Sequence, residues 1–311
     1  MLPPLLSCES ARIDVSGGPD IDGLNGESAG ASVGLVGPWG PLFSVLARQR
    51  RVRAGRIRVG GHDAEAAVAN GAVGLALFQP GLPRRWSVSQ YLKASARLAG
   101  LSERVAEAEA RSALERCQVS WLAGAKLGDL PPVHERLVVV LHATLGSPPI
   151  LALETPLSGL DEGSQRQLAE AIGRAGAGRR LLQSVAEASP GSVERMVLDG
   201  FEEVWLLGPG GVLARGSAAE VLAAANRYLV VVTREARRLA SVLVETGAQA
   251  SLSDPERPAS GEPGGQTAAD ARGGRLIVDL GPEQTPDVIV EAALAANSPI
   301  VEMLPLVAGS G

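Results

Sequence analysis

The chain has 311 residues, of which 45% are hydrophobic, and a formal net charge of -5. This length exceeds what a single hydrophobic core usually serves, so we expect two domains, and the acidic balance argues against a nucleic-acid partner. No apolar run approaches the ~18 residues that cross a bilayer, and the first residues lack the basic segment of a signal peptide, so we expect membrane contact only through partners.

Residues 1–226 alternate short apolar runs with longer helical patterns. Strands are predicted at Ser32–Val36, Arg56–Val59, Val73–Phe78, Ile150–Leu153, Arg180–Val185, Glu203–Leu207 and Val212–Ala214. Helices are predicted at Ser87–Ala99, Glu103–Arg116, Val133–Leu145 and Glu162–Ala175. Strands that alternate with helices of this length predict an α/β domain whose mostly parallel sheet is covered on both faces.

The pattern changes after Asn226. The predicted elements are, in order, strand Tyr228–Val232, helix Glu235–Thr246, strand Gln249–Leu252, strand Arg275–Leu280, helix Pro286–Ala296 and strand Pro299–Leu304. The order β-α-β-β-α-β predicts a small α+β, ferredoxin-like domain over residues 227–311. The segment of about 253–274 between its halves is rich in Pro, Gly, Ser and Ala, so we expect a disordered loop there.

The segment GPWGPLFS follows the first strand of the predicted parallel sheet. A phosphate-binding loop, GxxxxGK[ST], needs glycines for amide contacts, a lysine for charge and a Ser/Thr for magnesium. Gly37 and Ser44 fit this pattern, but Leu42 replaces the second glycine and Phe43 the lysine. A positive φ at Leu42 would cost roughly 1–2 kcal/mol, and Pro41 removes an amide donor. A strand–turn–helix without ligand therefore explains the segment better than triphosphate binding.

The run ILALETPLSGLD, Ile150 to Asp161, carries a strand into a carboxylate and a tight turn. In a P-loop nucleotide hydrolase the acid at such a strand end holds magnesium, and a second carboxylate beside it activates water. Glu154 takes the first of these positions and Thr155 the second. A threonine cannot accept a proton near neutral pH, so the water-activating base is missing.

These segments together resemble the nucleotide-binding subunit of an ATP-binding cassette (ABC) transporter over approximately residues 5–225. The run from Leu130 to Asp161 aligns without a gap onto the family's signature helix, Walker B strand and D-loop. Gln79 matches the Q-loop glutamine, which in the family links magnesium and water to the transmembrane partner. The resemblance implies a P-loop NTPase-like ABC ATPase domain with a helical subdomain at about residues 80–145.

The family signature LSGGQ, which binds the γ-phosphate held by the opposite subunit, is altered here. Its positions are Leu130, Pro131, Pro132, Val133 and His134. A proline has no amide hydrogen to donate, and a valine side chain blocks close approach of the backbone.

The resemblance also implies changes at the nucleotide. Thr155 stands at the catalytic glutamate, Val185 falls near the switch histidine, and Ala11 to Gly17 contain no aromatic residue to stack on adenine. The residual nucleotide-site positions are Gly37, Gly40, Ser44, Gln79 and Glu154. Trp39, inside the degenerate loop, is either a core residue or a plug of the phosphate pocket. ATP and magnesium are expected in the family, but the resemblance here implies no bound cofactor.

The D-loop is the motif that matches the family fully, at Ser158, Gly159, Leu160 and Asp161. In the family this loop contacts the other cassette across the dimer, so its presence implies pairing. The alternative is a plain turn followed by a helix N-cap, and the two interpretations are compatible.

The resemblance implies a catalytically inactive, cytoplasmic subunit with a structural or regulatory role, peripheral to the inner membrane. Its partners would be transmembrane transporter subunits and another ABC ATPase subunit, in a hetero- or homodimer. Two alternatives stay open, a weak ATPase that uses Glu154 as its base and a stand-alone module that binds another ligand. No metal site is expected, because His62, His134 and His142 share no ligand spacing and Cys8 and Cys117 are far apart.

Overall fold

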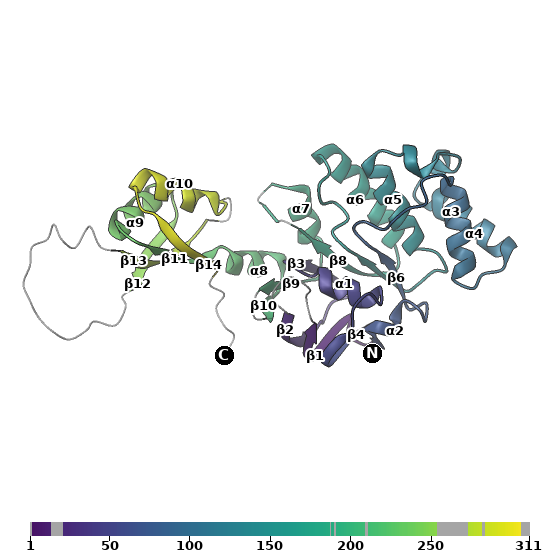
Figure 1. The fold of residues 1–311 in the computed structure, drawn as a ribbon, viewed down its shortest axis with the longest axis horizontal. Coiled ribbons are helices and arrows are strands. Elements are labelled where there is room, and N and C mark those ends of the chain that lie inside the picture. The colour runs from purple at the N-terminus through teal and green to yellow at the C-terminus, as the bar shows by residue number, and fades with distance from the viewer. Residues whose placement is uncertain are drawn as a thin grey trace, which may run out of the picture. The chain divides into compact units, whose positions relative to one another are not determined.

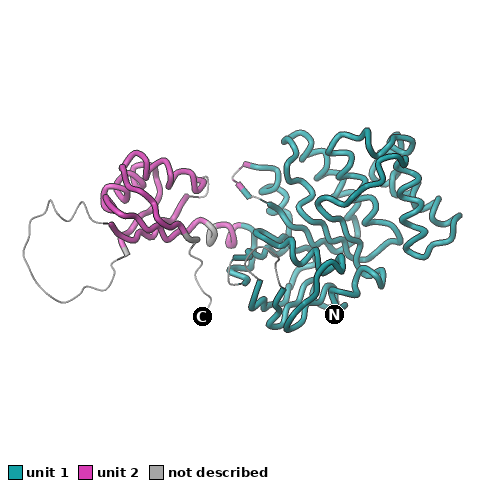
Figure 2. The backbone as a smooth tube through the Cα atoms, viewed as in Figure 1, with its two compact units in different colours: residues 1–188, 192–218 teal, residues 189–191, 219–311 magenta. Residues whose placement is uncertain are grey.

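The computed structural model describes residues 2–13, 21–186, 188–189, 191–208, 211–253, 273–281 and 284–305. The chain divides into two compact units, residues 1–188 with 192–218 and residues 189–191 with 219–311 (Figure 2). The division falls inside helix α8 (Ala218–Ala225), a few residues before the predicted boundary at residue 226. The loop expected at about 253–274 lies almost entirely outside the described residues.

The larger unit is built on a six-stranded sheet in the order β10-β9-β3-β8-β7-β6 (Figure 1). Its strands are β3 (Ser32–Val36), β6 (Val73–Ala76), β7 (Ile150–Leu153), β8 (Arg180–Val185), β9 (Glu203–Gly208) and β10 (Gly211–Gly216). All neighbours from β9 to β6 are parallel, and β10 is an antiparallel edge strand. Six of the predicted strands are therefore confirmed in this sheet.

A second sheet covers one face of the first. Its strands are β1 (Leu6–Ile13), β2 (Ile21–Glu27), β4 (Val52–Val59) and β5 (His62–Asp63), antiparallel in the order β2-β1-β4-β5. The sequence predicted a sheet covered on both faces, but it predicted only part of β4 and not that an antiparallel sheet forms one of the covers. Along β7, Ile150 and Ala152 join the core shared with this second sheet, whereas Leu151 and Leu153 join the core beneath the helices.

Helices cover the other face (Figure 1). They are α3 (Val88–Leu98), α4 (Glu103–Arg116), α5 (Pro132–Ala143), α6 (Glu162–Gly176) and α7 (Val193–Asp199), and the second-sheet side carries the short α1 (Gly40–Leu46) and α2 (Ala64–Ala67). The predictions for α3 to α6 are confirmed to within two residues at each end, whereas α2 and α7 were not predicted. Ser87 begins α3 with a capping box to Gln90, the local signal that fixes this helix start. Within the described ranges, no helix combines the length and apolarity needed to cross a membrane.

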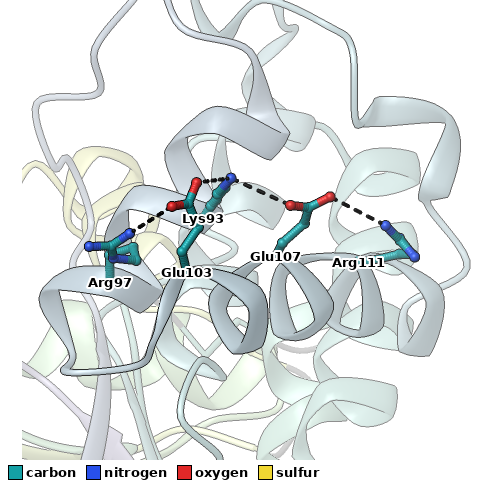
Figure 3. A network of polar contacts seen from close by, with 5 residues as sticks. All are labelled: Lys93, Arg97, Glu103, Glu107 and Arg111. Atoms are coloured by element: carbon teal, nitrogen blue, oxygen red, sulfur yellow. Dashed lines mark hydrogen bonds and ion pairs between the residues drawn. The ribbon is translucent and has the colours of Figure 1, made fainter.

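Helices α3 and α4 form a hairpin joined by small side chains and surface charges. Ala96 of α3 and Ala106 and Ala110 of α4 are buried in the same core. On the surface, Lys93 Nζ lies 3.0 Å from Glu103 Oε1 and 3.4 Å from Glu107 Oε2 (Figure 3). Exposed pairs of this kind add little to stability, so the buried alanine contacts contribute most to holding the hairpin together.

The smaller unit has the element order β-α-β-β-α-β. Its strands are β11 (Arg227–Val232), β12 (Gln249–Ser253), β13 (Gly274–Asp279) and β14 (Ile300–Pro305), and its helices are α9 (Ala236–Glu245) and α10 (Asp287–Ala296). The antiparallel sheet has the order β12-β13-β11-β14, and both helices pack on one face of it (Figure 1). Val230, Leu276 and Leu239 are among the fully buried side chains of this core.

A close approach of α5 to β6 depends on Gly74. A Cβ there would lie 1.8 Å from the carbonyl oxygen of Ala143 and 2.7 Å from Cγ of Pro148. We expect Gly74→Ala to lower the free energy of unfolding by about 1–3 kcal/mol, because backbone must move to admit the methyl group. Urea denaturation measures this change.

The matched control is Gly176→Ala at the end of α6, where a Cβ meets no atom within 4 Å. Its free energy of unfolding should change by less than about 0.5 kcal/mol. Equal effects of the two substitutions would contradict the close packing of β6 against α5.

Candidate functional site

The candidate site lies where parallel strands end at one edge of the larger sheet. Strands β3, β8, β7 and β6 are neighbours, and their carboxyl ends precede the segments that begin at Gly37, Ala186, Glu154 and Leu77. Ligands of open α/β sheets bind at such an edge. The sheet therefore brings the predicted phosphate loop, Gln79, Glu154 and the strand end at Val185 to one edge.

The loop after β3 is held closed by its own backbone and by Trp39. The Trp39 amide donates to the Gly37 carbonyl over 2.8 Å, and Trp39 Nε1 donates to the Val36 carbonyl over 3.0 Å. Gly37 has φ +102°, and a Cβ there would lie 2.5 Å from the Leu207 carbonyl oxygen. Packing against β9 is therefore sufficient to explain the glycine at position 37.

The expectation of strain at Leu42 is wrong. Helix α1 begins at Gly40, so Leu42 lies inside a regular helix and is not among the residues with positive φ. Pro41 is at the start of the helix, where a proline is well tolerated. The helix thus starts earlier than the phosphate-loop pattern assumes.

Three apolar side chains of this loop and helix are core residues. Trp39, Leu42 and Phe43 are at most 1% exposed and belong to the core between the two sheets. The Trp39 ring lies 6.3 Å from that of Trp205 on β9, at an interplanar angle of 57°. Of the two interpretations of Trp39, the structure supports the core residue. Phe43, at the lysine position, is directed into this core, so the segment supplies no cation to a phosphate.

Glu154 is tied to the neighbouring strand end. Its Oε2 accepts a hydrogen bond from the Phe78 amide over 3.0 Å, and a Cβ at Gly40 would lie 3.4 Å from its Oε1. The guanidinium carbon of Arg136 lies 3.8 Å from the centroid of the Phe78 ring. Burial raises the pKa of Glu154, while the Phe78 amide and the Arg136 charge oppose that rise. The acid thus joins β7, β6 and the start of α1 and is held beside a cation.

Arg136 and Phe78 belong to the candidate site, and the sequence analysis did not identify them. Burial lowers the pKa of Arg136, and its Nη1 is buried without a hydrogen-bond partner among the described residues. Gln79, whose side chain is exposed, directly follows Phe78 in this turn. In the sequence, Arg136 is a single arginine three residues after Val133. Its proximity to Glu154 becomes visible only when α5 packs against the end of β6.

Thr155 and Val185 offer no proton acceptor. Thr155 has φ +35°, an uncommon value for a β-branched residue, and its amide donates to Ser184 Oγ over 3.0 Å. Ser184 and Val185, at the end of β8, are at most 1% exposed. The two side chains that the resemblance aligns with the water-activating base and the switch imidazole therefore cannot take a proton near neutral pH.

The segment Leu130 to His134 forms the approach to helix α5. Pro131 is the N-cap and Pro132 the first helical residue, so neither offers an amide hydrogen to an anion. Glu135 places a negative charge in the first turn. The His134 ring lies 5.0 Å from that of Trp121 in an edge-on arrangement, and burial lowers its pKa. This helix start disfavours phosphate.

The turn Ser158 to Asp161 is at the surface. Asp161 caps α6, since its Oδ1 accepts from the Ser164 amide over 3.0 Å and its Oδ2 from Ser164 Oγ over 2.7 Å. These hydrogen bonds lower the pKa of Asp161. Gly159 is exposed with φ +74°, and a Cβ there would meet no atom within 4 Å. The turn-and-cap interpretation is thus correct for Asp161, and Ser158 and Gly159 stay accessible for contact.

The residues of this edge do not fit a magnesium triphosphate. The loop from Gly37 to Ser44 contains no cation, and Phe43, at the position aligned with the lysine, is buried in the core. Over the described residues, no group of three or more His, Cys, Asp and Glu side chains could hold a metal ion. The adenine-stacking position expected between Ala11 and Gly17 lies mostly outside those residues.

Comparison with known proteins gives matches over part of the chain. No protein-family model matches it. The Nod factor export ATP-binding protein I of Neorhizobium galegae is 28% identical over 159 residues, which are 49% of this chain and 46% of that protein. The protein of the same name from Rhizobium etli is 29% identical over 140 residues, 43% of this chain and 44% of that protein. The matches thus span less than half the length of these relatives.

Solved structures match over more of the chain. The cbiO1 protein of Clostridium perfringens, part of the ABC transporter complex cbiONQ, superposes with a TM-score of 0.59 at 18% identity, covering 71% of this chain and 91% of that one. A nucleotide-free ATP-binding cassette from an ABC transporter gives 0.57 at 16% identity, covering 70% and 93%. The larger part of the chain therefore has the fold of an ATP-binding cassette. With the curated relatives, this supports kinship with ABC transporter ATP-binding subunits.

The raised pKa of Glu154 predicts a pH-dependent stability. A carboxyl whose pKa is raised above its ordinary 4.5 stabilises the fold fully below that value, and this contribution is lost as the pH rises through the raised pKa. We expect Glu154→Gln to gain stability relative to the wild type as the pH rises from 4.5 towards neutrality. Urea unfolding at several pH values measures the difference.

Glu115→Gln, which changes an exposed carboxylate on α4, is the control and should follow the wild-type pH profile. Parallel profiles for the wild type and Glu154→Gln would show that burial does not perturb the carboxyl.

Proposed function

We propose that the chain is a cassette subunit of an ABC transporter that does not hydrolyse ATP. In this proposal it pairs with another cassette under transmembrane subunits and has a structural or regulatory role. The observation that carries the proposal is the burial of Phe43, 0% exposed, at the position where the phosphate loop has its lysine. A lysine at that depth without a paired charge would be strongly disfavoured, so loop and core are built for an apolar residue.

The other catalytic positions agree with this proposal. Thr155 and Val185 replace groups that move protons, and two prolines begin the helix that should contact the opposite γ-phosphate. These losses affect both halves of a composite site, one formed by this chain's loop and one by its signature segment. ATP at either composite site would therefore contact an altered segment of this chain, the loop in one site and the signature segment in the other.

Pairing is supported by the surface turn at Ser158, which is half-buried, and Gly159, which is exposed. The turn is stabilised from within, because Gln165 Nε2 donates to the Leu157 carbonyl over 3.2 Å and Asp161 caps α6. It can therefore present a defined backbone to a second cassette without ordering cost. We propose a hetero- or homodimer through this turn.

A transmembrane partner is supported by a groove near Gln79. The groove has a volume of about 430 Å³ and lies between β6 and helices α3 and α5. Its walls include Leu77, Pro80, Tyr91 and Val139, and His142 stacks on Tyr91 at 5.5 Å. We propose that a short amphipathic segment of a transmembrane subunit binds there, because the Q-loop is the family's link to that partner.

The smaller unit is proposed to be a ferredoxin-like accessory domain. Counting its strands in chain order, the sheet order is 4-1-3-2 with all neighbours antiparallel, which agrees with the split β-α-β arrangement. A regulatory or dimer-stabilising role for it rests on analogy with accessory domains of other cassettes.

The decisive experiment is a titration of the purified chain with labelled ATP and magnesium. We expect no saturable binding and no phosphate release, because no cation of the loop faces the phosphates. A cassette with an intact phosphate loop, measured in parallel, shows that the assay detects binding. Saturable binding at low micromolar affinity would contradict the proposal.

A second function, weak ATP hydrolysis with relocated chemistry, is favoured by one observation. Arg136 places a cation with a free Nη1 beside Glu154, and burial raises the pKa of that carboxyl towards the range of a general base. Turnover that Glu154→Gln and Arg136→Gln each abolish would support this function. Absence of turnover in the wild-type chain would exclude it.

Pairing through the turn makes a separate prediction. We expect Ser158→Arg to reduce the amount of partner cassette recovered with the tagged chain from native membranes, because a long charged side chain separates the two surfaces. Ser102→Arg is the matched control, since Ser102 is exposed and its side chain makes no cap hydrogen bond at α4. Quantitative mass spectrometry of the recovered proteins measures the loss.

Unchanged recovery with Ser158→Arg, at unchanged thermal stability, would show that this turn is not the pairing surface. Loss with both variants would point to a general effect of added charge, which contradicts the assignment equally.

A further inference from the structure

A pocket lies between helices α6 and α7 and the amino-terminal part of the larger sheet. Its volume is about 260 Å³, and its walls include Ser32 of β3, Ile172 and Gly173 of α6, and Met196 and Phe201 from α7 and the residues after it. The candidate site follows the opposite, carboxyl ends of the same strands. The pocket is thus separate from the residues that resemble a nucleotide site.

One polar side chain distinguishes this pocket from a packing defect. Gln183 of β8 lines it and is 0% exposed, and its Oε1 and Nε2 are both buried without a hydrogen-bond partner among the described residues. A buried amide that makes neither hydrogen bond destabilises the folded state, because both of its groups lose their hydrogen bonds to water. Native structures rarely keep such a group without a use, and an apolar residue would fill the position at lower cost.

The other lining residues determine which kind of molecule the pocket could bind. Ala169, Ile172, Leu181, Val197 and Phe201 are apolar, and among the described residues no charged side chain lines the pocket. The Ser32 hydroxyl oxygen already accepts from the Glu202 amide over 3.0 Å, which leaves its proton for donation. An ionised carboxylate would enter without a countercharge, and that is strongly disfavoured.

We propose that this pocket binds a small neutral molecule with an apolar body and a cis-amide edge, such as a lactam, a cyclic imide or a ureide. Because Gln183 is 0% exposed, its amide must turn toward the pocket when the ligand binds. The N–H of the ligand then donates to Gln183 Oε1 and its carbonyl accepts from Gln183 Nε2, so one ligand satisfies both orphan groups. The apolar body occupies the space between Ile172, Leu181 and Phe201. The volume is slightly below that of pockets for drug-sized ligands, so a single ring with short substituents is the expected size.

The probe for this site is ε-caprolactam, titrated into the full chain and followed by saturation-transfer NMR and calorimetry. N-methylcaprolactam keeps the ring and loses the donor, and cyclohexanecarboxylate keeps an apolar ring and adds a charge. We expect saturable binding of caprolactam and about tenfold or weaker affinity for both analogues, because each loses a hydrogen bond or adds an unpaired charge.

Two substitutions test the position of the site. Gln183→Leu removes both polar groups in a buried apolar setting, and should weaken caprolactam binding about tenfold or more without lowering the melting temperature. Gly173→Leu fills the pocket from helix α6, where a Cβ meets no atom within 4 Å, and should abolish binding. Gly176→Leu, in the same helix with equally open space and outside the pocket, should retain the affinity within about twofold.

Absence of saturable binding to the wild-type chain would overturn the proposal. Equal binding to the wild type, Gln183→Leu and Gly173→Leu would also overturn it, because the probe would then sit elsewhere. A crystal structure with ordered water on both amide atoms of Gln183 in the presence of saturating caprolactam would assign the pocket to solvent.

Discussion

Burial of the segment after β3 is the constraint on which the rest of the larger unit depends. Trp39, Leu42 and Phe43 anchor the first loop and helix in the core between the two sheets. Complete burial of side chains of this size contributes about 1.5–3 kcal/mol each. A phosphate loop needs the same stretch of backbone to face solvent with a lysine at the position of Phe43. The same segment cannot be buried in the core and also face a triphosphate, and in this chain it is buried.

The polar groups around this buried segment make hydrogen bonds and charge contacts within the protein. Glu154 accepts the Phe78 amide and lies beside the start of α1, so it connects three segments at the sheet edge. Arg136 covers the Phe78 ring and offsets the charge of the acid. Thr155 is fixed through Ser184 in a conformation unusual for its type. These hydrogen bonds at the strand ends are made within the protein.

The sequence predicted those elements whose pattern is local. Strands β3 and β7 and helices α3 to α6 follow from short apolar runs, helical periodicity and caps such as Ser87 and Asp161. Strand β1 was missed because its register shifts between Cys8 and Ile13 break the alternation that marks a strand. The strain expected at Leu42 was wrong, since the position of a helix start depends on what buries its first turn. The contact of Arg136 with Phe78 joins distant segments, and no local pattern encodes it.

Asp161 and its neighbours show how a motif can be matched for two reasons at once. The hydrogen bonds of Asp161 to Ser164 account for an acid at that position through helix capping alone. Gly159 is likewise explained by its positive φ. Ser158 differs, because neither a cap nor a backbone conformation requires a serine there. The proposed pairing with another cassette therefore depends on half-buried Ser158 and on the internally hydrogen-bonded turn that presents it, more than on the match of the whole motif.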